Sequence, residues 1–428
     1  MKHIIIIGNG VAGVTAARHI RMHSGEKITI ISKESDYFFS RTALMYVYMG
    51  HMKFEHIQPY ENNFWKDNGI QLKKGIVKSV DTKAKMLELE DGSKIVFDKL
   101  LIASGSKSNM FDWPGQNLKG VTGLYSKQDL ETLHEYSDGC KRAVVVGGGL
   151  IGIELAEMFN SRNIPVTFLI REKSFWSTVL PSEESEMINR HIAEHGIDLL
   201  LETELKEIIA DEKGRVTAVI TNTGERISCE IVGLAAGVTP NIDFLKSSGI
   251  ELDKGVLVNE FLETSVPDIY ALGDCAQQRA AIGSRKTVEA VWYTGRMMGE
   301  VVAQTICGNK MPYNPGHWFN SAKFFDIEYQ TYGWVWAKPK ENESHFYWEH
   351  VDGKMAIRFA YDKNTQAFLG VNLFGIRMRH EFFDRVLTEK RNVAYVIENL
   401  ASANFDPEFY KTYERDVQQA FTSKPVYA

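Results

Sequence analysis

The sequence contains no apolar run long enough for a membrane-spanning helix, which needs about eighteen or more such residues. It also has few cysteines, Cys140, Cys229, Cys275 and Cys307, and no CxxC pair. This spacing indicates neither a zinc site nor an iron–sulfur site, so we expect no bound metal. Scattered cysteines are typical of a reduced compartment, and the cytoplasm is the expected location.

An excess of positive charge is absent as well. The 49 Lys and Arg residues are outnumbered by 55 Asp and Glu, and the net charge of -6 gives no reason to expect a nucleic-acid partner. The apolar residues 4–7 are too few for a signal peptide. What remains is ordinary composition, 44% hydrophobic and 24% charged, over 428 residues, which is enough for two or three domains.

The first positive feature is a glycine-rich turn with the order Gly8-Asn9-Gly10-Val11-Ala12-Gly13. It follows a β-branched run and precedes a helical pattern (14–22) and a second strand (28–31). In this context Gly8 permits the tight turn, Gly10 lets the backbone approach a pyrophosphate, and Gly13 lets the helix pack on the strand. The helix start offers amides and a positive dipole end to the phosphates. The pattern predicts a dinucleotide site.

An acidic residue about twenty positions further on normally binds the ribose of the dinucleotide. Glu34 is the nearest candidate, just beyond the second strand. A solvent-exposed loop charge is the alternative role, and the sequence leaves both open.

A second turn of the same kind has the order Gly147-Gly148-Gly149-Leu150-Ile151-Gly152. After its return strand, Ile170 stands where an acid would bind a free 2′-hydroxyl, and Arg171 and Lys173 follow. Basic residues there suit a 2′-phosphate, which favours NADP over NAD, although Glu172 lies between them. Two dinucleotide sites on one chain indicate a tightly held flavin and an exchanging nicotinamide nucleotide.

Three further stretches match one known superfamily in the same order. They are DKLLIASGS at 98–106, IVGLAAGVTPN at 231–241 and TSVPDIYALGDCA at 264–276. Together with the two glycine turns, they make residues 1–305 resemble the two-dinucleotide-binding-domain flavoproteins of the pyridine nucleotide-disulfide oxidoreductase superfamily. That superfamily includes glutathione reductase-like enzymes, NADH oxidases, rubredoxin reductases, the flavin part of nitrite reductase and apoptosis-inducing factor.

The resemblance implies an α/β, glutathione reductase-like fold with two Rossmann-like domains, one for FAD and one for NAD(P), and an α+β C-terminal interface domain. The expected FAD domain is discontinuous, at 1–110 and 242–310, with the NAD(P) domain inserted at 111–241. The interface or dimerisation domain is expected at 311–428.

The resemblance also implies site residues. FAD is expected to contact Gly8, Gly10, Val11, Ala12, Gly13, Glu34, Arg41, Ala103, Ser104, Gly105, Gly273, Asp274, Val288 and Glu289. NAD(P)H is expected to contact Gly147, Gly149, Leu150, Ile151, Gly152, Glu154, Arg171, Lys173 and Gly237. Asp274 is expected to bind the ribityl chain, and Arg41 the adenosine or phosphate part of FAD. A surface loop arginine is the alternative for Arg41.

Two of these assignments depend on helix starts. A helix expected over 287–303 places Val288 and Glu289 at its N-terminus, which in relatives faces the flavin pyrimidine ring. For Glu154 two roles stay open: positioning the nicotinamide, as in the superfamily, or stabilising the helix N-terminus without any ligand.

The sequence departs from the superfamily at one informative place. No cysteine occurs in 36–50, where disulfide reductases and peroxidases carry their redox-active cysteine, and Arg41 aligns with that position. Without a sulfur nucleophile beside the flavin, disulfide exchange has no starting point. Tyr46 stands where ferredoxin reductase-like members have a lysine near flavin N5, so we assign no N5 partner.

From about residue 311 the pattern changes to strands at 344–351, 354–361 and 367–375, followed by helices at about 376–390, 392–403 and 407–421. This part of the chain contains an aromatic cluster, for which two roles are open: a docking face for the electron acceptor, or a sheet core with an oligomer contact. The cluster consists of Trp318, Phe319, Phe324, Tyr329, Tyr332, Trp334 and Trp336. The basic stretch 377–380 either meets an acidic partner or forms a solvated helix face.

We therefore expect an FAD-dependent NAD(P)H oxidoreductase that passes electrons to an acceptor without a redox-active cysteine. Three roles are open: a reductase of a small iron–sulfur protein such as a ferredoxin or rubredoxin, an oxidase or diaphorase acting on oxygen or quinone, and a redox-sensing binding module similar to apoptosis-inducing factor. A homodimer is the expected oligomer.

Overall fold

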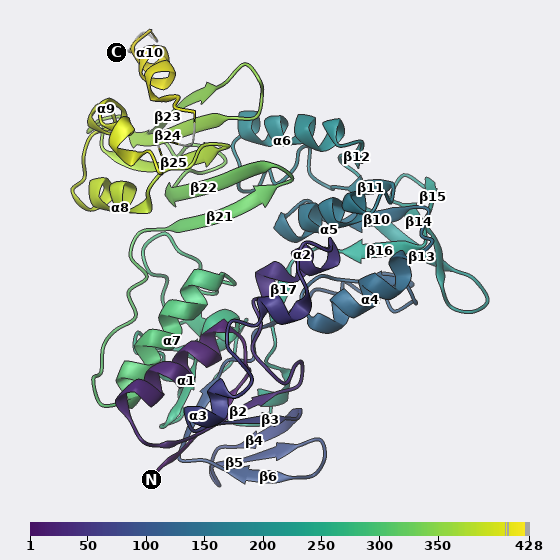
Figure 1. Ribbon diagram of the computed structural model, residues 1–428, viewed down its shortest axis with the longest axis vertical. Coiled ribbons are helices and arrows are strands. Elements are labelled where there is room, and N and C mark those ends of the chain that lie inside the picture. The colour runs from purple at the N-terminus through teal and green to yellow at the C-terminus, as the bar shows by residue number, and fades with distance from the viewer. Residues whose placement is uncertain (407, 409–410, 424–428) are drawn as a thin grey trace. The chain divides into compact units, whose positions relative to one another are not determined.

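The computed structural model describes residues 1–406, 408 and 411–423, which form two compact units (Figure 1). The first unit comprises Met1–Phe111, Thr122–Asp138 and Ala236–Pro315, and the second comprises Asp112–Val121, Gly139–Ala235 and Gly316–Ala428. Residues 122–138, which the sequence analysis includes in the NAD(P) domain, thus lie in the first unit. The predicted three-domain division stays a prediction.

The first unit is built on a parallel five-stranded sheet. Its strands, in spatial order, are β19 (Ile269–Ala271), β7 (Lys99–Ile102), β1 (His3–Ile7), β2 (Lys27–Ser32) and β3 (Ile70–Lys74). The four isoleucines of β1 are all buried, as expected for a central strand covered on both faces. The predicted strand, turn, helix and second strand are confirmed.

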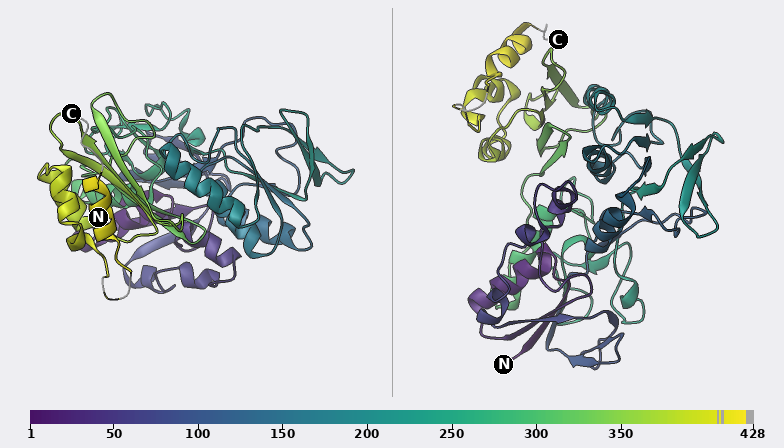
Figure 2. Two further views of the ribbon diagram at one scale, coloured as in Figure 1. Left: turned by 90° about the horizontal axis from the view of Figure 1, so that it is seen from above. Right: turned by 45° about the vertical axis from the view of Figure 1, so that its right-hand side comes forward.

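Two helices that are far apart in the sequence, α1 (Val11–His23) and α7 (Trp292–Ile306), lie side by side in this unit (Figures 1 and 2). They approach closely at Gly299, where an added Cβ would lie 2.7 Å from the carbonyl oxygen of Ala12. The unit also contains α2 (Leu44–Tyr48), α3 (Phe64–Asp67), α4 (Lys127–Ser137), β4 (Val77–Asp81), β5 (Met86–Leu89), β6 (Lys94–Val96), β8 (Ser106–Ser108), β17 (Val238–Pro240), β18 (Val256–Val258) and β20 (Ala276–Gln278).

The second unit contains another parallel sheet of the same kind. Its strands, in order, are β12 (Asp198–Leu200), β11 (Val166–Leu169), β10 (Ala143–Val146), β16 (Ile231–Leu234) and β9 (Val121–Thr122). Helices α5 (Leu150–Ser161) and α6 (Ser182–Glu194) belong to it, with an antiparallel sheet of β13 (Leu205–Ala210), β14 (Val216–Thr221) and β15 (Arg226–Ser228). Because the strand–turn–helix start recurs, the duplicated element predicted from the sequence is confirmed.

The C-terminal part of the second unit is an antiparallel sheet, as predicted. Its order is β21 (Phe319–Phe324), β22 (Ile327–Gly333), β25 (Phe368–Phe374), β24 (Ala356–Asp362) and β23 (Glu343–Glu349). Helices α8 (His380–Thr388), α9 (Val393–Glu398) and α10 (Glu414–Ser423) follow. The predicted helix over 407–421 includes residues 407 and 409–410, which lie outside the described residues, and the described helix begins at Glu414.

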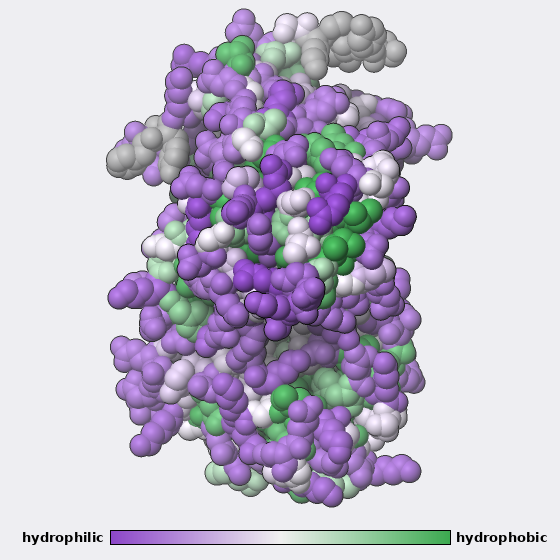
Figure 3. All heavy atoms as spheres, turned by 90° about the vertical axis from the view of Figure 1, so that its right-hand side faces the viewer, coloured by the Kyte–Doolittle hydropathy of each residue, from purple (hydrophilic) through white to green (hydrophobic). Residues whose placement is uncertain are grey.

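The fold is thus α/β with two Rossmann-like sheets and an α+β C-terminal part, as the sequence predicts. On the face drawn in Figure 3, hydrophilic residues predominate and hydrophobic ones gather in small groups. Within the described parts of the chain, every helix is too short or too polar to cross a bilayer.

Candidate functional site

The first glycine turn has the geometry that a phosphate-binding turn needs. Gly8 has φ +112°, and a Cβ there would lie 2.1 Å from the Ala103 carbonyl oxygen. A Cβ on Gly13 would lie 2.2 Å from the Gly8 carbonyl oxygen, so the helix could not approach the strand with a larger residue. At Gly10, by contrast, an added Cβ would meet no atom within 4 Å. The space above Gly10 is open, and the helix that begins at Val11 has no side-chain cap.

The second turn repeats much of this geometry. Gly147 has φ +114°, and a Cβ on Gly152 would lie 2.1 Å from the Gly147 carbonyl oxygen. Gly149 again has no atom within 4 Å of an added Cβ, and α5 begins at Leu150 without a side-chain cap. Each turn therefore packs tightly on its sheet side and leaves room for a diphosphate on its helix side.

The other predicted FAD turns converge on the first glycine turn. The Ala103 amide donates to the Ile7 carbonyl oxygen (2.8 Å), and Ser104 Oγ donates to the Asn241 carbonyl oxygen (2.7 Å). A Cβ on Gly273, whose φ is +73°, would lie 2.9 Å from Ala12 Cβ. The structure thus brings the start of α1, the 103–105 turn and the 273–275 turn together, and this cradle fits a bound FAD.

Asp274 has a buried partner that sequence reasoning misses. The Tyr125 hydroxyl donates to Asp274 Oδ2 (3.2 Å) and accepts from the Ser106 amide (2.8 Å). Burial raises the pKa of Asp274 above its usual value, although the hydrogen bond from Tyr125 acts in the opposite direction. Tyr125 directly precedes the capping box of α4, in which Ser126 and Asp129 bond to each other, so a Ser-x-x-Asp motif was the available signal.

Glu34 and Arg41 form a bidentate pair. Arg41 Nη1 lies 2.8 Å from Glu34 Oε1 and Nη2 lies 2.6 Å from Oε2, while the Lys127 amide also donates to Oε1 (2.9 Å). Burial alone would lower the pKa of Arg41, but Glu34, together with Tyr125 and Asp274, raises that pKa above its ordinary value. Their side chains are only 15% and 28% exposed, so the alternatives of an exposed acid and a surface arginine are wrong. Their contact with FAD stays a prediction.

Asn9, between the first two glycines, is a structural residue that the sequence analysis did not single out. Its Nδ2 donates to the Ser35 carbonyl oxygen (3.0 Å), and its Oδ1 accepts from Ser32 Oγ (2.9 Å). These bonds tie the glycine turn to the end of β2 and to the loop that carries Glu34.

The predicted helix over 287–303 begins later than its composition indicates. α7 starts at Trp292, with the extended residue Val291 as its N-cap. Val288 and Glu289 therefore lie in the preceding loop and supply no helix N-terminal amides, which corrects the expectation. The Glu289 carboxylate accepts from Arg285 Nη1 (3.2 and 3.1 Å), an ion pair that holds this loop. Any contact of their amides with flavin stays a prediction.

The predicted NAD(P) residues divide between the units. Arg171 Nε donates to Glu172 Oε1 (2.8 Å), the Arg171 side chain is 71% exposed, and Lys173 is exposed. These residues share the second unit with the 147–152 turn. Gly237 (φ +90°) lies in the first unit, where its carbonyl oxygen accepts from the Asn109 amide (3.0 Å).

Glu154 lies one turn inside α5. Burial, with a smaller contribution from Glu157, raises its pKa to about 7. Glu157 itself accepts from Lys323 Nζ (2.7 Å). The two roles of Glu154, positioning the nicotinamide and stabilising the helix N-terminus, both stay predictions.

Comparison with known proteins identifies the family. The model of the pyridine nucleotide-disulphide oxidoreductase family matches residues 2–299. The chain belongs to this family. The ferredoxin reductase subunit of 5,5'-dehydrodivanillate O-demethylase from Sphingobium is 31% identical over 334 residues, which cover 77% of this chain and 81% of the relative. An NADH oxidase from Methanocaldococcus jannaschii is 31% identical over 337 residues, covering 76% and 74%.

Solved structures share the fold. The covalent putidaredoxin reductase–putidaredoxin complex matches with a TM-score of 0.81 and 21% identity over 99% of each chain. As a member of this family, the protein is an NAD(P)H-dependent flavin oxidoreductase that uses FAD and NAD(P)H.

The family takes its name from disulfide chemistry, yet the described cysteines are poor nucleophiles. Cys275 Sγ donates to the Ile102 carbonyl oxygen (3.3 Å) inside the core, and burial raises the pKa of its thiol. Burial likewise raises the pKa of Cys140 to about 11 and that of Cys229 to about 12. These thiols stay protonated at neutral pH, and a thiol is a far weaker nucleophile than a thiolate.

We expect iodoacetamide treatment of the native holoprotein to leave NAD(P)H oxidation with ferricyanide at more than about 80% of its initial rate, since protonated thiols alkylate slowly. The check is a rate assay combined with mass spectrometry, which counts the modified cysteines. Loss of activity in step with one alkylated cysteine would show that a sulfur takes part in the reaction.

We expect Glu154→Gln to stabilise the protein in a pH-dependent way. The folded pKa of about 7 lies above the ordinary value of 4.5, so the folded state binds the extra proton between these values. The free energy of unfolding therefore falls as pH rises from 4.5 to about 7 and changes no further above. Glutamine removes this loss, of order 1–3 kcal/mol.

The measurement is the Tm difference between the variant and the wild type at about pH 5 and about pH 7.5. The free energy of unfolding of the wild type is expected to fall between these two pH values because Glu154 loses its proton. The stabilisation is expected to grow from the first pH to the second. Glu212→Gln, at an exposed position in the same unit, is the matched control. A Glu154→Gln effect that is the same at both pH values contradicts the raised pKa.

Proposed function

We propose that this protein oxidises NAD(P)H and passes the electrons, through FAD, to a small iron–sulfur protein. The observation that carries the proposal is the pair of matched turns, in which Gly10 and Gly149 are open in the same way. FAD, when bound, accepts a hydride and releases electrons one at a time or as a pair. The chain's task is then to orient two nucleotides, and it needs no sulfur for that.

The residues divide this task between the two units. In the first, the turn at Gly10 and the start of α1 bind the FAD diphosphate, Glu34 binds the adenosine ribose, and Asp274 binds the ribityl chain. Arg41 holds the Glu34 carboxylate in place through its two hydrogen bonds. In the second unit, the turn at Gly149 binds the diphosphate of NAD(P)H.

The nature of the acceptor is supported by the relatives. One is the ferredoxin reductase subunit of an O-demethylase, and a structural neighbour is a reductase covalently joined to putidaredoxin. A protein that accepts electrons from this chain is consistent with both. The predicted cytoplasmic location and homodimer also remain proposals.

An oxidase is the second candidate, and the similarity to an NADH oxidase favours it. The two functions differ in what re-oxidises the reduced protein. We expect NAD(P)H-reduced protein in air to re-oxidise slowly, over minutes, and an added ferredoxin to accelerate cytochrome c reduction by at least about tenfold. Fast oxygen uptake without a protein acceptor would favour the oxidase.

The C-terminal aromatic cluster gives limited support to a docking role. Phe324, Tyr329 and Tyr332 are buried, which supports the sheet-core role for these three. Trp334 stacks on Trp336 with ring centroids 4.9 Å apart, and both are half-buried. In the basic stretch, Arg377 is paired with Glu328, which weakens the case for a free cationic surface there.

NADPH is the proposed donor because Arg171 and Lys173 follow the position of Ile170. We expect Arg171→Ala to raise the KM for NADPH about tenfold and the KM for NADH less than about twofold, because one charge-assisted bond to a 2′-phosphate is lost. Steady-state kinetics with both nucleotides measure the ratio. Glu172→Gln is the matched variant: it frees Arg171 and is expected to lower the KM for NADPH. Equal effects on both nucleotides would remove the case for a phosphate site.

A further inference from the structure

Helix α6 joins the nucleotide-binding part of the second unit to the C-terminal sheet. Arg358 of β24 donates to Glu184 (2.9 Å) and Glu183 (2.8 Å), and Asn372 of β25 also donates to Glu184 (2.8 Å). These buried contacts hold the start of the helix. The end of the same helix carries a different kind of contact, made by histidines.

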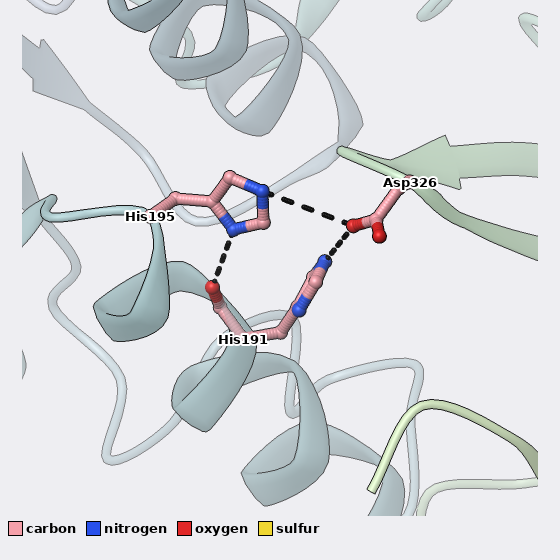
Figure 4. A group of neighbouring side chains, drawn as sticks. All are labelled: His191, His195 and Asp326. Carbon is pink, nitrogen blue, oxygen red and sulfur yellow. Dashed lines mark hydrogen bonds and ion pairs between the residues drawn. The ribbon is translucent and has the colours of Figure 1, made fainter. Parts of the chain in front are cut away.

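Two histidines one turn apart face a carboxylate on the turn between β21 and β22 (Figure 4). His191 Nε2 lies 2.6 Å and His195 Nε2 lies 3.8 Å from Asp326 Oδ1. The His191 side chain is 1% exposed, and neither of its ring nitrogens meets hydrogen-bond geometry with a partner among the described residues. The Asp326 oxygen is thus close to the buried imidazole without hydrogen-bond alignment, which is how two ligands of one ion approach each other.

Neighbouring groups orient the imidazole rings of His191 and His195 so that a nitrogen of each faces Asp326. His195 Nδ1 lies 2.9 Å from the His191 carbonyl oxygen, which can only accept, so Nδ1 carries the proton and Nε2 presents a lone pair toward Asp326 (Figure 4). His191 Nδ1 lies 3.5 Å from Glu194 Oε2, a charge contact without hydrogen-bond geometry, and its Nε2 is the nitrogen that faces Asp326. The His195 ring is also stacked on Phe325, with centroids 4.2 Å apart, which fixes its orientation.

We propose that His191, His195 and Asp326 bind a divalent transition-metal ion of the Zn²⁺ type, which links the end of α6 to the β21–β22 turn. This site lies outside both nucleotide turns and does not depend on the proposed function. The cysteine spacing predicts no metal site. No local sequence motif predicts this one either, because Asp326 is far from the two histidines along the chain.

The spacing suits a tetrahedral ion. Bonds of about 2.0–2.1 Å place neighbouring ligand atoms about 3.3 Å apart. The two distances to Asp326 lie on either side of this value, and all three donor atoms lie within 4.8 Å of one another. The Asp326 side chain is 61% exposed on a turn, so its carboxylate can shift by the required distance of about 1 Å. Two imidazoles and one carboxylate select Zn²⁺-type ions over Ca²⁺ or Mg²⁺, and leave a coordination position for water.

One neighbour opposes the ion. Lys354 Nζ lies 3.5 Å from Asp326 Oδ2 and places a positive charge next to the site. The side chain is 44% exposed, so this repulsion is partly screened by solvent. A variant without the Lys354 charge is expected to bind the metal more tightly. Variants that remove a ligand can only weaken binding, so this variant tests the site in the opposite direction.

The test uses the FAD-loaded full chain without a polyhistidine tag, freed of metal with EDTA and titrated with Zn²⁺ by calorimetry. We expect one ion per chain with a micromolar or lower Kd, about −8 kcal/mol or better. Titration with Co²⁺ is expected to give the visible bands of a tetrahedral site, beyond the flavin absorbance. Zn²⁺ is also expected to raise the Tm of the wild type.

The variants decide the assignment. His195→Gln and Asp326→Asn are each expected to weaken Zn²⁺ binding at least about tenfold, and Lys354→Met to strengthen it. His350→Gln removes the His350–Asp352 pair of the same unit (3.2 Å) and is the matched control, expected to change nothing. Far-ultraviolet circular dichroism confirms folding. No binding below about 1 mM, or equal binding by the wild type, His195→Gln and Asp326→Asn, would overturn the proposal.

Discussion

We expect the Gly10→Glu variant to purify as a folded but colourless protein. Gly10 has φ −73° and ψ −179°, a conformation that any residue adopts, and an added Cβ meets no atom within 4 Å. The substitution therefore costs the fold little. Its carboxylate would occupy the position in which the FAD diphosphate meets the amides at the start of α1, and the two negative charges would repel each other. The expected loss of FAD affinity is about a thousandfold, or about 4 kcal/mol.

The measurement is the ratio of flavin to protein absorbance, with circular dichroism as the check on folding. Gly25→Glu is the matched control: Gly25 also has no atom within 4 Å of an added Cβ, but it lies in the loop after α1, away from the turn. This control is expected to stay yellow. A Gly10→Glu protein with the full flavin content would reject the assignment of the first turn.

The parts of the site that sequence predicts are those fixed by local sterics. Gly8 and Gly13 must be glycine because a Cβ on either would collide with backbone oxygens at 2.1–2.2 Å. Such a constraint appears in the sequence as a fixed spacing within a few residues, and the second turn repeats the collision at Gly152 and the positive φ at Gly147. The isoleucine-rich β1 and the antiparallel C-terminal strands are likewise local, and the pattern of apolar residues along the chain predicts them.

The parts that sequence misses depend on contacts between distant segments. Tyr125 reaches Asp274 only because residues 122–138 return to the first unit, a path that no local pattern encodes. The position of Glu34 in the sequence makes it a candidate ribose ligand, but its bidentate pairing with Arg41 requires the loop geometry. The start of α7 was misplaced because the composition of 287–291 fits a helix, whereas Val291 is extended. In this last case the tertiary structure overrides the helix propensity of the segment.

The second large effect is expected from Gly149→Glu, the counterpart of Gly10→Glu in the other turn. Its backbone, with φ −116° and ψ −171°, is again extended, and its Cβ would again meet no atom within 4 Å. The new carboxylate would repel the diphosphate of NAD(P)H rather than that of FAD. We expect a yellow protein with full flavin content in which kcat/KM for NADPH with ferricyanide falls at least about a hundredfold, or about 2.7 kcal/mol.

Because the two variants place the same charge at equivalent positions of two equivalent turns, their phenotypes must separate if the turns hold different nucleotides. Gly10→Glu loses colour, whereas Gly149→Glu keeps colour and loses bleaching by NADPH in stopped-flow measurements. Dithionite needs no nucleotide site and is expected to bleach Gly149→Glu at the wild-type rate, so a damaged flavin environment is distinguished from a blocked donor site. Bleaching of Gly149→Glu by NADPH at the wild-type rate would mean that the donor does not bind at the second turn.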